Sequence, residues 1–429
     1  AGLAIMREWR RVVREGPPTF EAMKAMAETY RSESVQDVSV GELRDKLDIL
    51  GRWLDAHELT FGIAGGVAQS LQAMGTFLPE WLGSDWRELL NASLQGQGTV
   101  ISAQQIVRLA ELAELAFLEE PVRRWFLDDG WTAARFPEPL AGTTFLRRFE
   151  QYLAEYGHRA VGESDIMSPR MAEQPEAVLS VIRTQVRTGD VKRPTDILSR
   201  QATQRRDALA EITRRFGWRR HRWGIFRWWH RRLTRFCVLR EANRHHLMYY
   251  SLAVRRLLFR LGERMVERGV LAMPDDIFYL TMDEQRALSN GDQHNWQGLV
   301  RERREERARN VQLQVPDTIR DWESLVQEDS PCTGSGGEGS LRGIPISAGE
   351  FTGPVRIVRS TADWGRVSPG DILVVPVIDP GMAPLFGMAG GLIAEMGGTL
   401  SHGAIIAREY GLPVLVNVPY ATSLLRENE

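Results

Sequence analysis

The sequence predicts a multidomain α and α/β protein, in which a large all-helical domain is tethered to a small β/α domain. Apolar residues recur at helical spacing through residues 1–328, and alternation of β-branched residues is scarce there. Residues 329–340 are rich in Gly and Ser, a composition typical of flexible linkers. Beyond them, through residues 341–429, the pattern changes to short strands and turns. These three ranges are the predicted domains and linker.

Apolar stripes and terminal signals predict individual helices in the first domain. One helix is expected to end at Gly269, because glycine suits the left-handed C-terminal cap. Thr281 and Glu284 have the spacing of a capping box that opens the next helix. The prolines are expected to separate helical segments; they are Pro17, Pro18, Pro121, Pro137 and Pro139. The two clearest stripes comprise Leu43, Leu47, Leu50 and Leu54, and Val254, Leu257, Leu258, Leu261 and Met265.

The small domain has the pattern of a compact β/α unit of ordinary domain size. A turn is expected at residues 368–371 and a helix at about 402–409. The run at residues 372–377 is uniformly apolar, as in a strand buried on both faces. The other expected strands lie within residues 353–359, 392–396 and 411–416.

Composition excludes several classes of protein. Of the 429 residues, 43% are hydrophobic and 26% are charged, so the chain is not disordered. The net charge of −2 gives no basic field that would point to nucleic acid as a partner. Cys237 and Cys332 are too few for a disulfide framework or a four-cysteine zinc site, and no metal site is predicted. We expect a cytoplasmic protein, since neither a membrane span nor a signal segment is found.

The segment 214–240 interleaves ten arginines with Trp218, Trp223, Trp228 and Trp229. Such a pattern can stack on single-stranded nucleic acid or lie on a membrane surface. The interpretation favoured here is a long amphipathic helix with buried tryptophans and solvated or ion-paired arginines. Some of these tryptophans could instead form the wall of a pocket for a large apolar substrate.

The residues around His402 carry the strongest chemical signal. Gly397 and Gly398 let the backbone turn sharply and approach a ligand closely. Ser401 suits an N-cap, which places His402 in the first turn of a helix, where backbone N–H groups favour a phosphate. The same field disfavours the imidazolium, so one nitrogen of His402 would be free as a nucleophile.

This segment resembles the phosphohistidine motif of the phosphoenolpyruvate-utilising enzymes, and residues 341–420 resemble their swivelling β/β/α domain. The resemblance implies that His402 is phosphorylated and then delivers the phosphoryl group elsewhere. It also implies that Gly398 and Ser401 lie at the substrate. Leu400 before Ser401 and His402 is similar to the rifampicin phosphotransferase branch of the family.

The helical domain resembles the substrate-binding domain of the same branch around residues 156–175 and 240–281. In those relatives an Arg and a Lys, four residues apart, are implicated in phosphoryl transfer. Arg240 matches the first of them, and Arg244 stands where the Lys would be expected. Residues four apart share a helix face, so both cations could reach one phosphate. The alternative is a pair of solvated or ion-paired arginines.

Two histidines of the helical domain are further candidates for substrate binding. His158 lies in the stretch that resembles the substrate domain, and His245 follows Arg244 directly. The alternative for His158 is a packed, hydrogen-bonded side chain, which is the commoner fate of a single histidine. His246 could line the same pocket as His245.

The resemblance also implies ATP and Mg²⁺, because members of the family charge the histidine from ATP or from phosphoenolpyruvate. No Gly-rich nucleotide-binding segment occurs in this sequence, which reaches Glu429 before the last strands expected of a swivelling domain. Three explanations stay open: a longer protein, a separate ATP-grasp-type subunit that charges His402, or reuse of the fold without phosphorylation.

The leading functional hypothesis is a phosphotransferase, or a component of one, that carries a phosphoryl group on His402 to an oxygen of a small organic molecule such as an antibiotic or natural product. One alternative is a biosynthetic dehydratase or condensing enzyme of the same fold, with His402 as phospho-carrier or as a general acid/base. Another is a regulatory module that binds a small molecule without turnover.

Overall fold

The computed structural model describes the greater part of the chain: residues 2–32, 37–55, 59–95, 101–189, 194–311, 313, 340–347, 349–398 and 411–428. Ser401, His402, the helix expected at about 402–409, Cys332 and the predicted linker, apart from Ser340, lie outside these residues. The described chain forms two compact units. The first comprises residues 1–24, 58–249 and 336–429, and the second comprises residues 25–57 and 250–335. The predicted domain boundaries therefore stay a prediction.

Helices make up the first unit up to its C-terminal sheet, as the sequence predicts. No strand precedes Ile344 in the described residues. Two of its helices, α1 (Gly2–Ser32) and α10 (Arg220–Glu267), continue into the second unit. The others are α3 (Leu59–Leu82), α4 (Trp86–Ser93), α5 (Ile101–Leu118), α6 (Glu120–Leu127), α7 (Thr144–Tyr156), α8 (Glu176–Thr188) and α9 (Pro194–Phe216), with short 3₁₀ turns η1 (Ala133–Arg135) and η2 (Glu138–Leu140).

The C-terminal part of the first unit is a five-stranded sheet with the strand order β1-β5-β4-β3-β2. The strands are β1 (Ile344–Ser347), β2 (Val355–Ile357), β3 (Ile372–Val377), β4 (Gly391–Met396) and β5 (Val414–Val416). β2, β3, β4 and β5 run parallel, and β1 pairs antiparallel with β5. Short helical turns, η5 (Thr361–Arg366), η6 (Pro380–Met382), α13 (Ala383–Phe386) and α15 (Ala421–Leu424), connect or follow the strands. The predicted α and α/β fold class is confirmed, as are its four expected strands.

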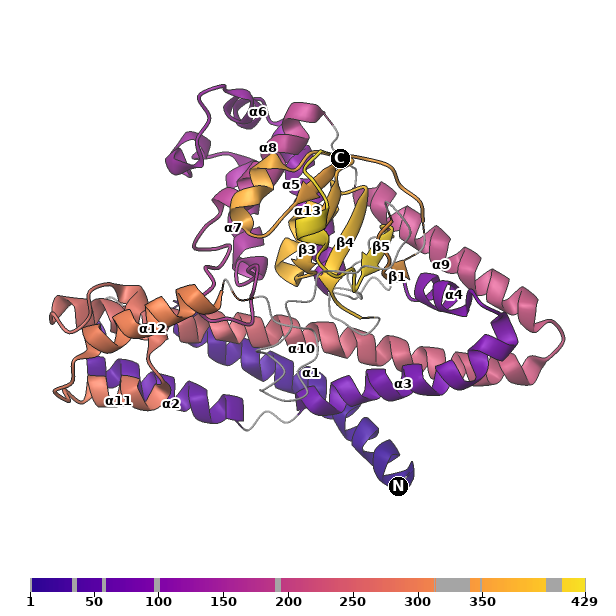
Figure 1. Cartoon of the computed structure of the whole chain (residues 1–429), viewed down its shortest axis with the longest axis horizontal. Helices are drawn as coiled ribbons and strands as arrows, with labels where there is room; N and C mark the ends of the chain where they lie inside the picture. The colour runs from indigo at the N-terminus through magenta and orange to yellow at the C-terminus, as the bar shows by residue number, and fades with distance from the viewer. Residues whose placement is uncertain are drawn as a thin grey trace. The chain divides into compact units, whose positions relative to one another are not determined.

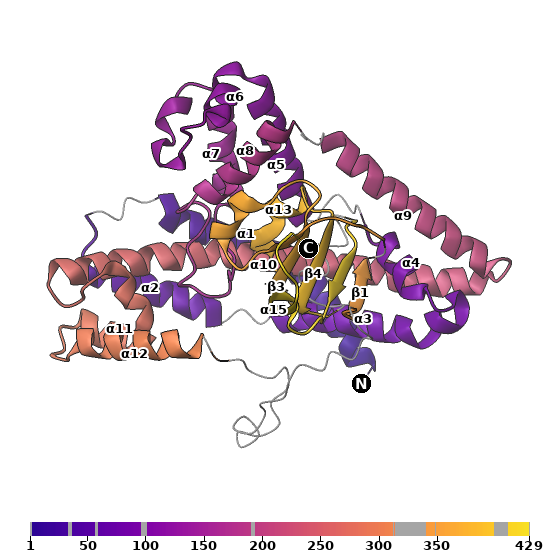
Figure 2. The same ribbon diagram turned by 45° about the horizontal axis from the view of Figure 1, so that its top comes forward.

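Within the first unit the helical turns that flank the sheet contact two helices: α13 contacts α5 and α8, and η5 contacts α8 (Figure 1). A single buried apolar cluster includes Ala113 of α5, Val181 of α8, Trp364 of η5 and Leu373 of β3. Trp364 is fully buried where η5 contacts α8. Figure 2 shows α13 lying beside α5, in agreement with their contacts. The sheet is therefore docked on these helices through an apolar interface.

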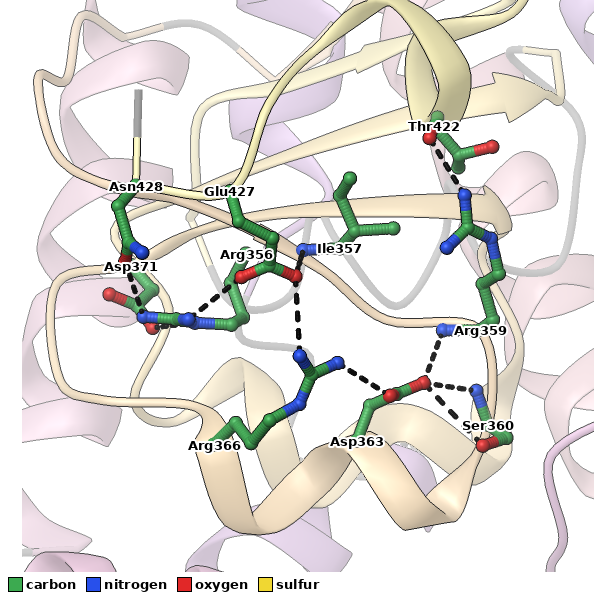
Figure 3. A network of polar contacts seen from close by, with 10 residues as sticks. All are labelled: Arg356, Ile357, Arg359, Ser360, Asp363, Arg366, Asp371, Thr422, Glu427 and Asn428. Atoms are coloured by element: carbon green, nitrogen blue, oxygen red, sulfur yellow. Dashed lines mark hydrogen bonds and ion pairs between the residues drawn. The ribbon is translucent and has the colours of Figure 1, made fainter.

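A polar network holds the end of the described chain against β2 (Figure 3). The Arg356 guanidinium donates to Asp371 at 3.0 Å and to Glu427 at 2.8 Å, and Glu427 accepts the backbone N–H of Ile357. Arg366 of η5 forms an ion pair with Asp363. These contacts fix residues 427 and 428 to the sheet.

The second unit is helical and contains α2 (Val40–Asp55), η3 (Pro274–Tyr279), α11 (Met282–Ser289) and α12 (Trp296–Asn310). The predicted capping box is confirmed, because Thr281 accepts the N–H of Glu284 and the Glu284 carboxylate accepts that of Thr281. Gly269 adopts φ +71° just beyond α10, as a C-terminal cap requires. No helix in the described ranges is long and apolar enough to cross a membrane.

The expectation that Pro17 and Pro18 separate two helices is wrong, because both lie inside α1. A proline within a helix loses one backbone hydrogen bond and clashes with the preceding turn. Here both prolines face solvent, whereas Val12, Phe20 and Met23 are buried on the other side of α1. The free energy gained by burying that face of α1 outweighs the cost of the two prolines.

The segment 214–240 is not one amphipathic helix with buried tryptophans. It divides between the end of α9 and the start of α10, with Gly217 at φ +54° between them. Trp218 at this turn is 86% exposed, and Trp228 is 49% exposed. The buried ring that anchors the start of α10 is Phe226, which packs on Phe216 of α9.

Candidate functional site

The candidate site lies at the edge of the sheet where the parallel strands β3 and β4 end. Val377 of β3 and Met396 of β4 are paired, so the residues that follow them leave the sheet side by side. Asp379 follows β3, and Gly397 and Gly398 follow β4. Gly397 has φ +154° and lies against Val416, which explains the need for glycine there. Polar residues beyond the carboxyl ends of parallel strands commonly form ligand sites.

Asp379 joins this edge to the loop between α7 and α8. Its carboxylate accepts the backbone N–H of Gly381 at 2.7 Å and that of Gly162 at 3.1 Å. Gly381 lies so close to the carbonyl of Ala160 that any side chain at this position would collide with it. The loop 157–175 therefore contacts the turn that follows β3 through backbone groups.

Within that loop, Glu163 is the centre of a buried ionic network. Its carboxylate accepts two hydrogen bonds from Arg159, at 3.1 and 3.2 Å, and both side chains are fully buried. Arg170, also fully buried, donates to the carbonyl oxygen of Glu163 at 2.9 Å. Burial of ionised groups is expensive unless they are paired, so each partner depends on the others for compensation.

Arg240 and Arg244 lie one turn apart on α10, as their spacing predicts. The Arg244 guanidinium donates to Glu163 at 2.7 Å and to the hydroxyl of Ser164 at 2.9 Å. Its side chain is 26% exposed. Arg240 is half-buried. Arg244 is therefore ion-paired, and this ion pair fixes its position beside the loop. The roles of Arg240 and Arg244 in phosphoryl transfer stay a prediction.

The structure brings His158 and His245 together, with ring centroids 4.5 Å apart and Tyr249 next to both. Both histidines are buried. Burial, followed by the positive charge of Arg159, holds the pKa of His245 well below its usual value, so this ring is neutral. The pKa of His246, which stacks on Phe20, is also lowered by burial. Both rings are thus packed in the interior of the first unit. The expected part of His158 and His245 in substrate binding stays a prediction.

Sequence reasoning missed Asp379 and the central position of Glu163. Asp379 had a signal, because a carboxylate two residues after a buried parallel strand is placed at the sheet edge. Glu163 lies in a stretch that only the family resemblance pointed out. Its ion pair could not be predicted locally, because its partner Arg244 is 81 residues away in the sequence. No group of three His, Cys, Asp or Glu side chains suited to a metal ion occurs in the described residues, so these residues do not form a Mg²⁺ site of that kind.

Comparison with known proteins places these elements in a family. Residues 60–241 match the model of the rifampicin phosphotransferase fourth domain, and residues 367–429 match that of the PEP-utilising enzyme mobile domain. The chain belongs to the family of phosphoenolpyruvate-utilising enzymes. Within this family it falls in the rifampicin phosphotransferase branch.

Relatives from this branch match most of the chain. A rifampicin phosphotransferase of a Streptomyces species is 32% identical over 82% of the chain and 41% of the relative. One from Bacillus cereus is 24% identical over 97% of the chain and 48% of the relative. The chain therefore spans less than half the length of these curated relatives. Asp379 and Gly398 lie in the range that matches the mobile domain. Glu163 and Arg240 lie in the range that matches the rifampicin phosphotransferase fourth domain.

The carboxylate of Asp379 makes the contact between these two domains sensitive to pH. Burial and the nearby negative charge of Glu163 raise its pKa to about 6. The pKa of Asp379 is higher in the folded protein than in the unfolded chain. The protonated carboxyl therefore contributes its full stabilisation of the fold below about pH 4, and this contribution is lost as the pH rises through about 6. We expect wild type to lose roughly 2 kcal/mol of stability over this range relative to Asp379→Asn, which mimics the protonated carboxyl.

Thermal unfolding of wild type and Asp379→Asn, measured in parallel between pH 4 and 8, checks this expectation. Asp363→Asn is the matched control, because the pKa of Asp363 is lowered and its stabilisation is instead lost on acidification. A constant difference between wild type and Asp379→Asn would contradict the raised pKa.

Proposed function

We propose that the chain is the acceptor-binding and phospho-carrier portion of a phosphotransferase. In this proposal His402 carries a phosphoryl group, which it transfers to an oxygen of a small organic molecule bound near Arg240 and Arg244. The observation that supports the proposal best is the hydrogen bond between Asp379 and Gly162. It holds the sheet edge that leads to His402 against the loop whose Glu163 binds Arg244.

The short segment between Gly398 and His402 supports the same arrangement. His402 follows Gly398 by four residues, which span roughly 14 Å at most when fully extended. Gly398 leaves the sheet beside Asp379, because β3 and β4 are paired to their ends. A phosphoryl group on His402 would therefore stay near the edge of the sheet that contacts the loop 157–175.

The transfer step needs positioning and charge stabilisation more than covalent chemistry from the protein. The acceptor oxygen attacks phosphorus while the N–P bond breaks, and the bonding pair returns to the imidazole nitrogen of His402. The hydroxyl proton of the acceptor passes to solvent, and His402 takes up one proton from solvent, so that its neutral imidazole is restored. Negative charge spreads over the three equatorial oxygens, where guanidinium groups donate strong, charge-assisted hydrogen bonds. Arg240 and Arg244 would supply these groups.

Charging of His402 requires a donor, for which we propose ATP with Mg²⁺ on a nucleotide-binding domain or subunit of the ATP-grasp type. The sheet would have to leave its apolar interface with α5 and α8 to reach that donor. The mobility predicted from residues 329–340 therefore forms part of the proposal. Because the relatives are named for rifampicin, rifampicin is the first acceptor to test.

Phosphoramidate, which phosphorylates imidazole nitrogens, allows the test without a donor domain. We expect the protein to gain one acid-labile phosphoryl group that peptide mass spectrometry assigns to His402. Rifampicin should then remove it and gain a phosphate in a single turnover. Loss of the phosphoryl group to water at the same rate with and without rifampicin would exclude rifampicin as acceptor. Failure of His402 to become charged, while the exposed His221 and His294 do, would contradict the carrier role.

The two arginines are expected to act on the transition state and not on acceptor affinity. Arg240→Gln should lower the single-turnover transfer rate by about 10²–10³-fold, because it removes one donor from the developing charge. Arg244→Lys should be tolerated, since Lys keeps the positive charge opposite Glu163 and is the residue expected at this position in the relatives. The measurement is transfer from phospho-His402 at increasing acceptor concentration, with the exposed Arg206→Gln as control. If the variants changed only the acceptor concentration that gives half of the maximal transfer rate, the two arginines would instead act in acceptor binding.

A further inference from the structure

A groove between α1 and the first half of α10 has no place in the proposed transfer step. It has a volume of about 630 Å³, within the range of sites for drug-sized ligands. Arg244 lies eight residues beyond Phe236, the last α10 residue of the groove, or roughly 12 Å along the helix axis. The groove belongs wholly to the first unit.

The wall of this groove is strongly basic. The lining includes no acidic residue but five arginines, Arg10, Arg227, Arg231, Arg232 and Arg235. None of the five has an ion pair with any residue that the structure describes. Other arginines of the first unit are paired with carboxylates, as Arg215 is with Asp85. The groove therefore carries several positive charges that the described protein does not compensate.

Aromatic rings, with Met6 and Val13, line the groove beside these arginines. The Arg232 guanidinium lies over Trp9 and within 5.2 Å of the centre of Trp228. Its Nε is buried and finds no hydrogen-bond acceptor among the described residues. Burial lowers the pKa of Arg232 to about 10, so it is still a cation at neutral pH. Trp228 is half exposed, which leaves ring surface for a planar ligand.

Gly224 adds room at one end of the groove. A Cβ there would meet no described atom within 4 Å, although glycine within a helix costs about 1 kcal/mol relative to alanine. No backbone requirement explains the residue, since it has no positive φ. Its effect is to keep the groove open beside Arg227 and Trp228.

We propose that this groove binds a planar aromatic small molecule that carries a carboxylate, sulfonate or phosphate group. The anionic group is bound by Arg231 and Arg235, and the ring stacks beside Trp228 and Arg232. The inference is independent of phosphoryl transfer by His402, because it concerns binding alone. A groove of this volume accommodates one such molecule, in contrast to the extended series of stacking sites that single-stranded nucleic acid requires.

Two fluorescent probes with the same ring system test the proposal. Anilinonaphthalene sulfonate carries an anion, and N-phenyl-1-naphthylamine does not. We expect saturable binding of the sulfonate by the whole chain, at least about tenfold tighter than that of the neutral amine. Salt should weaken binding of the sulfonate only, because the arginines are exposed and screened.

Variants locate the binding. The double variant Arg231→Gln/Arg235→Gln should weaken sulfonate binding by at least about tenfold, and Gly224→Leu should block it by filling the groove. The matched control is Arg219→Gln/Arg220→Gln, which removes two exposed arginines that do not line the groove. Equal binding by all variants would overturn the proposal. So would displacement of the probe by an oligothymidylate at lower concentration than by 1-naphthoate, which would make nucleic acid the ligand.

Discussion

Replacement of His402 by alanine is expected to abolish phosphoryl transfer entirely. A side chain that only moves protons contributes about 10²–10⁴-fold, so its loss leaves a measurable rate. A covalent carrier leaves none, because without the imidazole no N–P bond forms and the acceptor has no phosphoryl group to attack. The size of the loss therefore separates the carrier from a general acid/base.

The measurement is formation of phosphorylated acceptor from protein treated with phosphoramidate, or from ATP once a donor domain is added. His221→Ala is the matched control, because His221 is an exposed histidine at the start of α10, remote in sequence from the proposed transfer residues. Thermal unfolding of His402→Ala should match wild type, which excludes misfolding as the cause. A residual rate of acceptor phosphorylation within about 10⁴-fold of wild type would instead show that His402 moves protons in the transfer and is not the carrier.

Local patterns predicted the sheet well. The apolar run at residues 372–377 is β3 with the same bounds, because a strand buried on both faces needs no alternation. The same reasoning failed at Pro17 and at Gly217. At Pro17, buried residues from distant parts of the fold outweigh a local helix-breaking signal. At Gly217, one residue with a left-handed backbone divides what looked like a continuous amphipathic stripe.

The site was predictable only in part, because its connections join distant segments of the chain. The spacing of Arg240 and Arg244 follows from helix geometry, which one sequence contains. The contact of Asp379 with Gly162 joins residues 217 positions apart, and nothing in either local sequence specifies the other. For His158 the local motif identified the residue but did not predict that its side chain is fully buried.

Glu163→Gln is expected to destabilise the protein by about 3–5 kcal/mol, the usual cost of removing one partner from a buried ion pair. Arg159 and Glu163 are fully buried, so solvent cannot compensate the remaining guanidinium. The neutral amide can accept a hydrogen bond from Arg159 or Arg244 but cannot balance either charge. Chemical denaturation of wild type and variant measures the difference, and Glu176→Gln on the exposed start of α8 should stay within about 0.5 kcal/mol of wild type.

The same substitution should slow phosphoryl transfer even below the unfolding temperature, because Glu163 fixes Arg244 through the 2.7 Å bond to its Nε. A double-mutant cycle with Arg244→Gln separates the two effects. If Glu163 acts on transfer through Arg244, its substitution should slow the reaction much less once Arg244 is already Gln. The loss of stability should largely persist in that background, since Arg159 stays buried and uncompensated. Fully additive effects on the transfer rate would mean that Glu163 does not act by positioning Arg244.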